Sequence, residues 1–335
     1  MDESNAMQDD VLLDQNEEFV APEVSHVGLI FQALSDTVNN VAGTEGLTTP
    51  QMYFHGVLSA AGGLTHAQSV EGAEGFFANV KSGAKAAIAY IKKMFADIWG
   101  FFFKKKAPEE VKALKKEIAE TKADFSSTEK VKTGLLRAAG DSKELGEKIK
   151  AASSMGDLNG LSKDVAKANA RGQQALVVKV GQLKEALEDE IKLAGEIETQ
   201  AKASGEADYT AWASGVKGSV AGTQALINAI KDIRDLNDIS AAEATLGHLK
   251  TYADVMERSI ETAAGTEARV KGRIDALGKL DDSTSLTDEQ KKEGDKNLAS
   301  LQVFMKTAAR YSALLKRTLS HMKSVNTAVG KVFGV

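Results

Sequence analysis

The sequence predicts an all-α protein, an elongated bundle of long amphipathic helices with a small helical, partly disordered N-terminal region. Proline occurs three times and never after Pro108, so nothing in the following 227 residues interrupts a helix by removing a backbone donor. This stretch is rich in Ala, Lys, Glu and Leu, which are all good helix formers. Its apolar residues also recur at steps of three and four over long runs, which is the spacing of one helical face.

The chain divides into an acidic leader, a basic aromatic helix and an elongated helical bundle, at residues 1–75, 76–106 and 107–335. The first 25 residues are acidic and polar, a composition typical of disorder. Residues 26–70 mix small and apolar residues with glycines, and they predict two or three short helices separated by loops. Pro50 is expected at the first position of one of these helices, where proline fits best.

The second part, residues 76–106, predicts an amphipathic helix with an aromatic face and a basic flank. It holds eight of the 19 aromatic residues of the chain, and from Lys81 on it has seven lysines against the single acid Asp97. Its apolar residues follow helical spacing, at Phe77, Val80, Ala84, Ile88, Ile91, Phe95, Ile98 and Phe102.

Three roles are open for this helix. It could lie on a membrane surface with its aromatic face buried among the lipids, its lysines could contact nucleic-acid phosphates, or it could be a core helix packed against the rest of the protein. For the first two roles the residues expected to contact a polyanion or a membrane are Lys81, Lys85, Lys92, Lys93, Trp99, Phe101, Phe102, Phe103, Lys104, Lys105 and Lys106.

The third part predicts helices of roughly 30–45 residues, because three apolar stripes continue at heptad-like steps. A helix is expected to start at Pro108-Glu109-Glu110, where proline and acids suit the first turn. Capping boxes are predicted from Ser126, Ser240 and Thr287, and turns at Gly140, Gly156–Gly160, Gly205 and Asp281–Ser285. The stripes are Leu176, Val180, Leu183, Leu187, Ile191, Ala194, Ile197; Leu246, Leu249, Ala253, Met256, Ile260, Ala263, Val270, Ile274, Leu277; and Leu298, Leu301, Met305, Ala308, Tyr311, Leu315, Leu319, Met322, Val325, Val329, Val332.

The charges of the chain are strongly segregated. Residues 1–80 contain no Lys or Arg but 12 acids, whereas the remainder holds all 42 bases and the other 35 of the 47 acids, a net charge of +7. The overall charge of −5 therefore combines an acidic leader with a basic body. Such asymmetry favours a body that meets a polyanion or an anionic surface and a leader that restrains it.

No catalytic or metal-binding pattern is present in the sequence. Phosphate-binding glycine loops, dinucleotide fingerprints, zinc-protease motifs and serine-nucleophile motifs do not occur, and the five histidines are scattered. Asp157-Leu158-Asn159-Gly160 lacks the acid that would complete a calcium loop, so it is interpreted as a turn. Cysteine is absent, which excludes disulfides and thiolate sites. We therefore expect no enzymatic activity, no metal and no cofactor.

Two small–x–Glu triplets, Ser69-Val70-Glu71 and Gly72-Ala73-Glu74, lie where the acidic leader ends. In this layout the chain resembles the internal head (inner-body) proteins of large tailed bacteriophages. The resemblance implies a propeptide that a prohead protease cuts after Glu71 or Glu74. It also implies a mature protein stored inside the capsid after assembly in the host cytoplasm, in contact with packaged DNA and with capsid or other internal head proteins. It implies no enzymatic activity.

Two other functions stay open. The chain could be a membrane-active protein similar in outline to the long-helix pore-forming toxins, with residues 76–103 as the membrane element and 1–75 as its cover. It could also be a helical scaffold or adaptor, because heptad-like stripes serve homo-oligomers as well as intramolecular bundles.

Overall fold

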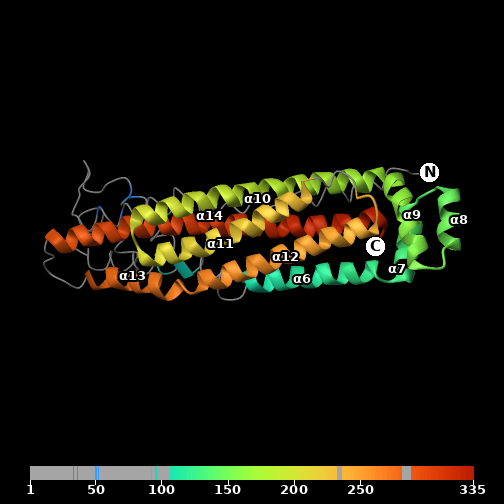
Figure 1. The fold of residues 1–335 in the computed structure, drawn as a ribbon. Helices are drawn as coiled ribbons and strands as arrows, with labels where there is room; N and C mark the ends of the chain where they lie inside the picture. Colours follow the sequence, from blue (N-terminus) through green and yellow to red (C-terminus); the bar gives the residue numbers. More distant parts are fainter. Residues whose placement is uncertain are drawn as a thin grey trace.

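The computed structural model describes residues 33, 36, 50, 52, 92, 95, 96, 106–231, 236–280 and 288–335. Every regular element in this part of the chain is an α-helix and none is a strand, which confirms the predicted all-α class. The helices lie mostly lengthwise and form an elongated rod (Figure 1). Of the acidic leader only Ala33, Asp36, Pro50 and Met52 are described, all four as helical, so its predicted disorder lies outside the described residues.

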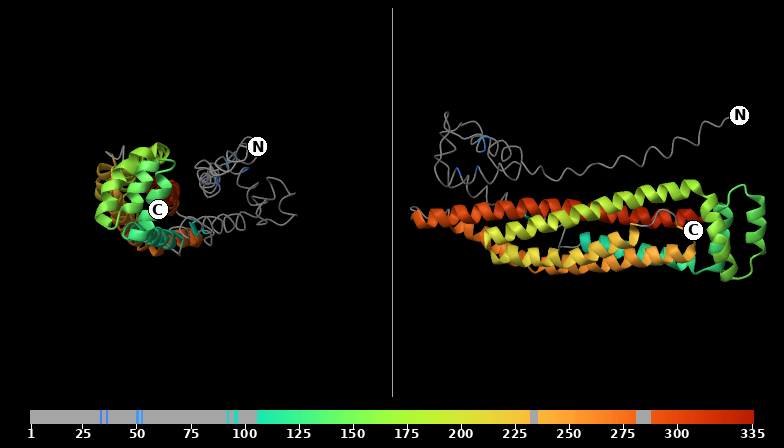
Figure 2. Two further views of the ribbon diagram at one scale, coloured as in Figure 1. Left: turned by 90° about the vertical axis from the view of Figure 1, so that its right-hand side faces the viewer. Right: turned by 45° about the horizontal axis from the view of Figure 1, so that its top comes forward.

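The longest helix, of 46 residues, extends along the rod and packs against a second helix of 35 residues (Figure 2). The chain reverses after this second helix, runs back, and reverses again, so that four helices lie side by side. The first helix of the rod covers two of them, α12 and α14. The helices of the rod are α6 (Lys106–Phe125), α10 (Ala170–Ser204), α11 (Ala207–Ile230), α12 (Ile239–Ala264), α13 (Glu267–Leu280) and α14 (Asp288–Phe333).

Three shorter helices close one end of the rod: α7 (Thr128–Ala138), α8 (Lys143–Ala151) and α9 (Met155–Ala168). Figure 1 shows α8 and α9 running across the long axis, next to the C-terminal end of α14. They are amphipathic and bury Leu145 and Ile149 of α8 and Leu158 and Val165 of α9. The end of the rod is therefore covered by packed side chains.

The predicted stripes form the core of the rod. All members of the α14 stripe in the described residues are buried, as are those of the α12–α13 stripe. In the α10 stripe only Ile191 is half-buried. Ala263, Leu277 and Leu298 lie where side chains are not described. The spacing of three and four residues predicts the buried positions correctly, because each long helix packs one continuous face against its neighbours.

An aromatic cluster joins α11 to α14. The ring of Phe304 lies 5.1 Å from that of Tyr209 and 5.3 Å from that of Trp212, edge to face in both cases. Trp212 also meets Tyr311 edge to face at 5.9 Å. Pairs of this geometry stabilise a fold by about 0.5–1.5 kcal/mol each, in addition to the energy of burying their apolar surface. The cluster therefore helps to fix the position of α11 along the axis of α14.

The turn predictions are correct at two glycines and wrong at a third site. Gly140 and Gly205 have positive φ angles of 57° and 69°, a conformation that glycine adopts without a steric cost. The predicted turn at Gly156–Gly160 is instead inside α9. That helix starts earlier because Ser154 and Asp157 form a capping box, in which the Asp157 carboxylate accepts the Ser154 N–H at 3.0 Å. The predicted turn at Asp281–Ser285 lies outside the described residues.

The predicted capping boxes are wrong in detail. Ser127, one residue after the predicted Ser126, is the N-cap of α7. Ser240 is inside α12, whose first turn is capped by Asp238 through its Oδ1, which accepts the Ala241 N–H at 2.9 Å. Asp238 and Ser240 are both of a residue type that can be an N-cap. Asp238 takes this position because an N-cap has a non-helical backbone, whereas Ser240 is already inside the helix. Thr287 lies outside the described residues.

Candidate functional site

The predicted contact residues are mostly outside the described part of the chain. Lys92 is helical and forms an ion pair with Asp275 of α13 at 2.7 Å, and nearby Phe95 is buried in the core. Lys92 therefore lies next to α13. Lys106 is the first described residue of α6. The structure does not describe Glu71, Glu74, Lys81, Lys85, Lys93, Trp99, Phe101, Phe102, Phe103, Lys104 or Lys105.

The best-defined surface feature is the elbow between α9 and α10, which turns at the single residue Asn169. Its Oδ1 accepts the Gly172 N–H at 3.0 Å and so caps the start of α10. Its Nδ2 donates to the carbonyls of Lys331 and Val332 at 3.1 and 3.0 Å, near the end of α14. One side chain therefore ties three helix ends together.

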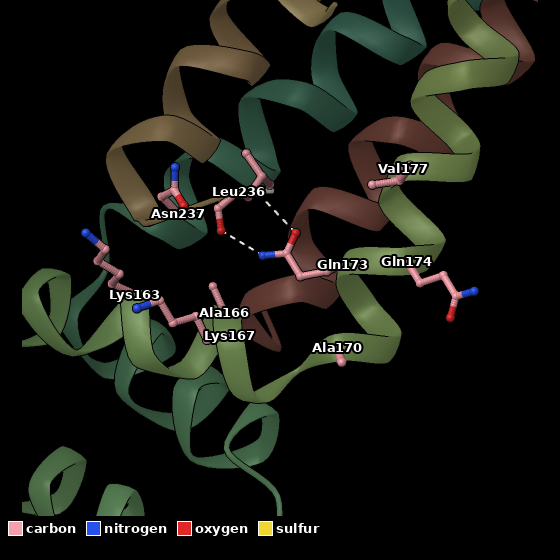
Figure 3. Close-up of a pocket in the computed structure, with 9 residues that line it drawn as sticks. All are labelled: Lys163, Ala166, Lys167, Ala170, Gln173, Gln174, Val177, Leu236 and Asn237. Carbon is pink, nitrogen blue, oxygen red and sulfur yellow. Dashed lines mark hydrogen bonds between the residues drawn. The ribbon is translucent and has the colours of Figure 1, made fainter. Parts of the chain in front are cut away.

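A pocket of about 490 Å³ opens beside this elbow. Gln173 forms one wall, and its amide makes two hydrogen bonds with the backbone of Leu236, at 2.7 and 3.0 Å. In Figure 3, Lys163 and Lys167 extend on the same side of this wall, whereas Gln174 points away. The described residues that line this elbow pocket are Lys163, Ala166, Lys167, Ala170, Gln173, Gln174, Val177, Leu236 and Asn237.

The two charged side chains among the described residues that line the pocket are both positive. Lys163 and Lys167 are exposed, and so are Arg171 and Lys331, which lie close to Asn169 or to its bonded carbonyl. None of these four, the elbow cations, has an ion pair with another described residue. No carboxylate is among the described residues that line the pocket. The pKa of Lys148 of α8 is raised mainly by its hydrogen bond to Glu144, and the charge of Asp164, the neighbour of Lys163, adds a smaller contribution.

Arg171 is placed against the usual preference of a helix. It lies in the first turn of α10, which contains no acidic residue, although that turn favours negative charge. Lys167 and Lys331, in the last turns of α9 and α14, are at positions that the helix dipole favours. The dipole therefore explains two of the elbow cations but not Arg171.

A buried polar layer lies farther along the rod, at Glu190 of α10. This carboxyl group is 5 % exposed, and the Tyr252 hydroxyl donates a hydrogen bond to it. Burial raises the pKa of Glu190 to about 7, and the hydrogen bond from Tyr252 opposes this increase. Burial also raises the pKa of Tyr252, so the phenol remains a donor at neutral pH.

A second polar layer lies around Asp208, at the start of α11. Asp208 is 3 % exposed and forms an ion pair with Arg273 of α13. The Nη1 of Arg273 donates to both carboxylate oxygens of Asp208, at 3.0 and 2.9 Å. Arg273 also donates to Asn297 of α14 at 2.9 Å. Both polar layers are enclosed by helices and neither opens to a described pocket, so we assign them to the architecture of the rod.

Within the described residues no group of three or more His, Asp or Glu side chains could hold a metal ion. No helix in that part of the chain has the length and apolar character that crossing a membrane requires. Sequence reasoning missed the elbow. The available signal was the pair Lys163 and Lys167, four residues apart on one helical face, but only the fold shows that Lys331 lies nearby.

Comparisons with protein-family models, with curated proteins and with solved structures find no match to this chain. The function must therefore be argued from the residues themselves.

Proposed function

We propose that this chain is a structural, non-enzymatic protein of a phage head, made as a precursor and stored with the genome after its acidic leader is removed. The observation that supports it is the charge break. Twelve acids and no base precede Lys81, and the two small–x–Glu triplets lie just before that boundary. Cleavage after Glu74 would change the net charge from −5 to +7, because the 12 acids of the leader would be lost.

In this proposal the basic body binds a polyanion, and the acidic leader weakens that binding until it is removed. Lys and Arg side chains that meet phosphates release counterions, and this gives sequence-independent affinity that falls steeply with salt. A precursor with a leader of −12 should bind DNA weakly during assembly, whereas the basic body should bind it more tightly. The charge density of the body is low, so the expected contact is weak and non-specific.

The distribution of charge along α14 indicates where such contact could occur. Residues 296–335 hold seven bases and no acid. Arg310 and Arg317 in the middle of the helix pair with Glu196 and Asp189 of α10. These ion pairs at the rod surface largely compensate the two positive charges. Lys331 near the elbow has no such partner among the described residues. Lys331 therefore leaves one uncompensated positive charge of α14 at the elbow end.

A scaffold or adaptor role is the second candidate. The observation that favours it is the shape of the described rod, which has a continuous apolar core and long helices. Such a rod is suited to hold other proteins at a fixed separation.

The deciding experiment is the intact mass and N-terminal sequence of the protein from its native particles. A start at Gly72 or Gly75 would support the processed phage-head protein and the charge reversal. A start at Met1 in the functional form would contradict the propeptide and favour the scaffold.

A further inference from the structure

We propose that the elbow pocket is a binding site for phosphate groups, held between the side chains of Lys163 and Lys167. This proposal concerns the folded rod and does not depend on removal of the leader. If the native protein starts at Met1, the proposed cleavage of the leader is refuted, but the proposed phosphate site is not affected.

The first argument is the charge of the pocket. Two ammonium groups line it, no carboxylate does so among the described residues, and neither lysine is neutralised by an ion pair there. Elsewhere on the rod many cations pair with acids, such as Lys115 with Glu257 at 2.8 Å and Lys217 with Glu198 at 2.8 Å. A lysine binds phosphate as a compact point charge with three donors, so two on one face suit a group with several anionic oxygens.

The second argument is that the pocket is already formed. Gln173 uses both ends of its amide to hold Leu236, and Asn169 fixes the start of α10 against the end of α14. A ligand would therefore not have to order these walls, which lowers the entropy cost of binding. The volume of about 490 Å³ lies within the range of about 300–1,000 Å³ of small-molecule sites, so a di- or triphosphate group fits.

The third argument is Arg171, the cation that the helix dipole disfavours. At the start of α10 the helix dipole disfavours its charge, and it raises the positive potential next to the pocket. Residues that break a local preference often mark functional positions. Arg171 does not line the pocket, so we assign it to attraction of the anion and not to direct contact.

Two sources could supply such a group: the backbone of a nucleic acid, or a free polyphosphate compound. Both present several phosphate oxygens with delocalised negative charge. The full-length chain should be titrated with tripolyphosphate by calorimetry and with a labelled DNA duplex by fluorescence anisotropy, both at low and at moderate salt.

Three variants test the site. In Lys163→Gln/Lys167→Gln we expect tripolyphosphate affinity to fall by about tenfold or more, since charge-assisted bonds are the strong ones. The control Lys112→Gln/Lys122→Gln removes two exposed, unpaired lysines of α6 and should leave the affinity nearly unchanged. Ala170→Asp places a carboxylate in the pocket, in a first turn that favours acids, so binding should be lost without a lower melting temperature.

The two ligands separate the sources. If DNA affinity also falls in both pocket variants, and its salt slope decreases by about two units, a nucleic-acid backbone is the source. If only tripolyphosphate affinity falls, the source is a free polyphosphate. The proposal is overturned if the wild-type chain does not bind tripolyphosphate at low salt, or if the α6 control weakens binding as much as the pocket pair.

Discussion

Glu190 is the residue whose chemistry the fold changes most. Its carboxyl group lies inside the rod, and its pKa is raised to about 7 by burial. In the unfolded chain the same group should titrate near its ordinary value of about 4.3. Between these two pH values the folded state holds a proton that the unfolded state has released. Folding stability should therefore decrease as the pH rises from about 4.3 through 7, and this contribution should be constant above that.

We predict that Glu190→Gln removes this part of the pH dependence. The amide stays neutral and can still accept a hydrogen bond from Tyr252, so the variant should be more stable than the wild type at pH 8, by up to about 4 kcal/mol from the difference between the two pKa values. At pH 4 the two proteins should be close. Urea unfolding at both pH values measures the difference.

The matched control is Glu188→Gln, which changes an exposed carboxyl group two positions earlier on α10. It should alter stability by less than about 0.5 kcal/mol, because exposed ion pairs contribute little. If Glu190→Gln were less stable than the wild type at pH 8, the carboxylate itself would be stabilising the layer and our account would be wrong.

At the scale of elements, the junction of α7 with the end of α14 depends on two glycines. Gly334 has a φ of 70°, and the Gly334 and Val335 N–H groups donate to the carbonyls of Lys331 and Gly330 at 3.3 and 3.0 Å. This is the Schellman pattern that ends helices. A Cβ on Gly134 of α7 would lie 2.8 Å from the Phe333 carbonyl oxygen. The two backbones therefore meet at a distance that only glycine allows.

We predict that Gly134→Ala destabilises the protein by about 1–3 kcal/mol, since overpacking forces the backbones apart. The control Gly146→Ala lies in the middle of α8, where a Cβ meets nothing within 4 Å. This control should gain up to about 1 kcal/mol, because alanine is the better helix former. Urea unfolding of the two variants compares them, and equal gains for both would refute the close approach.

The sequence predicts the long helices well and their ends less well. Stripes such as Leu315, Leu319 and Met322 identify the core, because apolar residues three or four positions apart lie on one face of a helix and that face is buried. Helix starts depend instead on which of several neighbouring polar residues caps the backbone, and Asp238 and Ser240 are equally suitable by type. The elbow pocket was unpredictable, because Gln173 and Leu236, 63 residues apart, are brought together only by packing.

At the scale of the whole molecule, charge is arranged in two ways. Along the rod many cations and acids are paired between helices, as in Arg310 with Glu196 and Lys323 with Glu117. These pairs hold neighbouring helices in register and leave little net field. The imbalance lies between the acidic leader and the rest of the chain. Binding of a polyanion to the full chain should therefore depend on the leader even where the leader makes no contact with the ligand.

A full-length variant can test this without truncation. The eight acids in residues 1–25 are Asp2, Glu3, Asp9, Asp10, Asp14, Glu17, Glu18 and Glu23. Their replacement by Asn or Gln changes the net charge from −5 to +3 and leaves the described helices unaltered. We predict that DNA affinity rises about tenfold at low salt and that the difference shrinks at about 0.5 M salt, because screening shortens the reach of the leader's field.

The salt dependence separates this effect from a direct contact between the leader and the body. A purely electrostatic restraint should disappear as the Debye length falls toward about 3 Å, whereas a leader docked by apolar contacts would keep its effect at high salt. Equal DNA affinity of both proteins at low salt would show that the leader does not restrain the basic body. The charge break would then require an explanation other than control of binding.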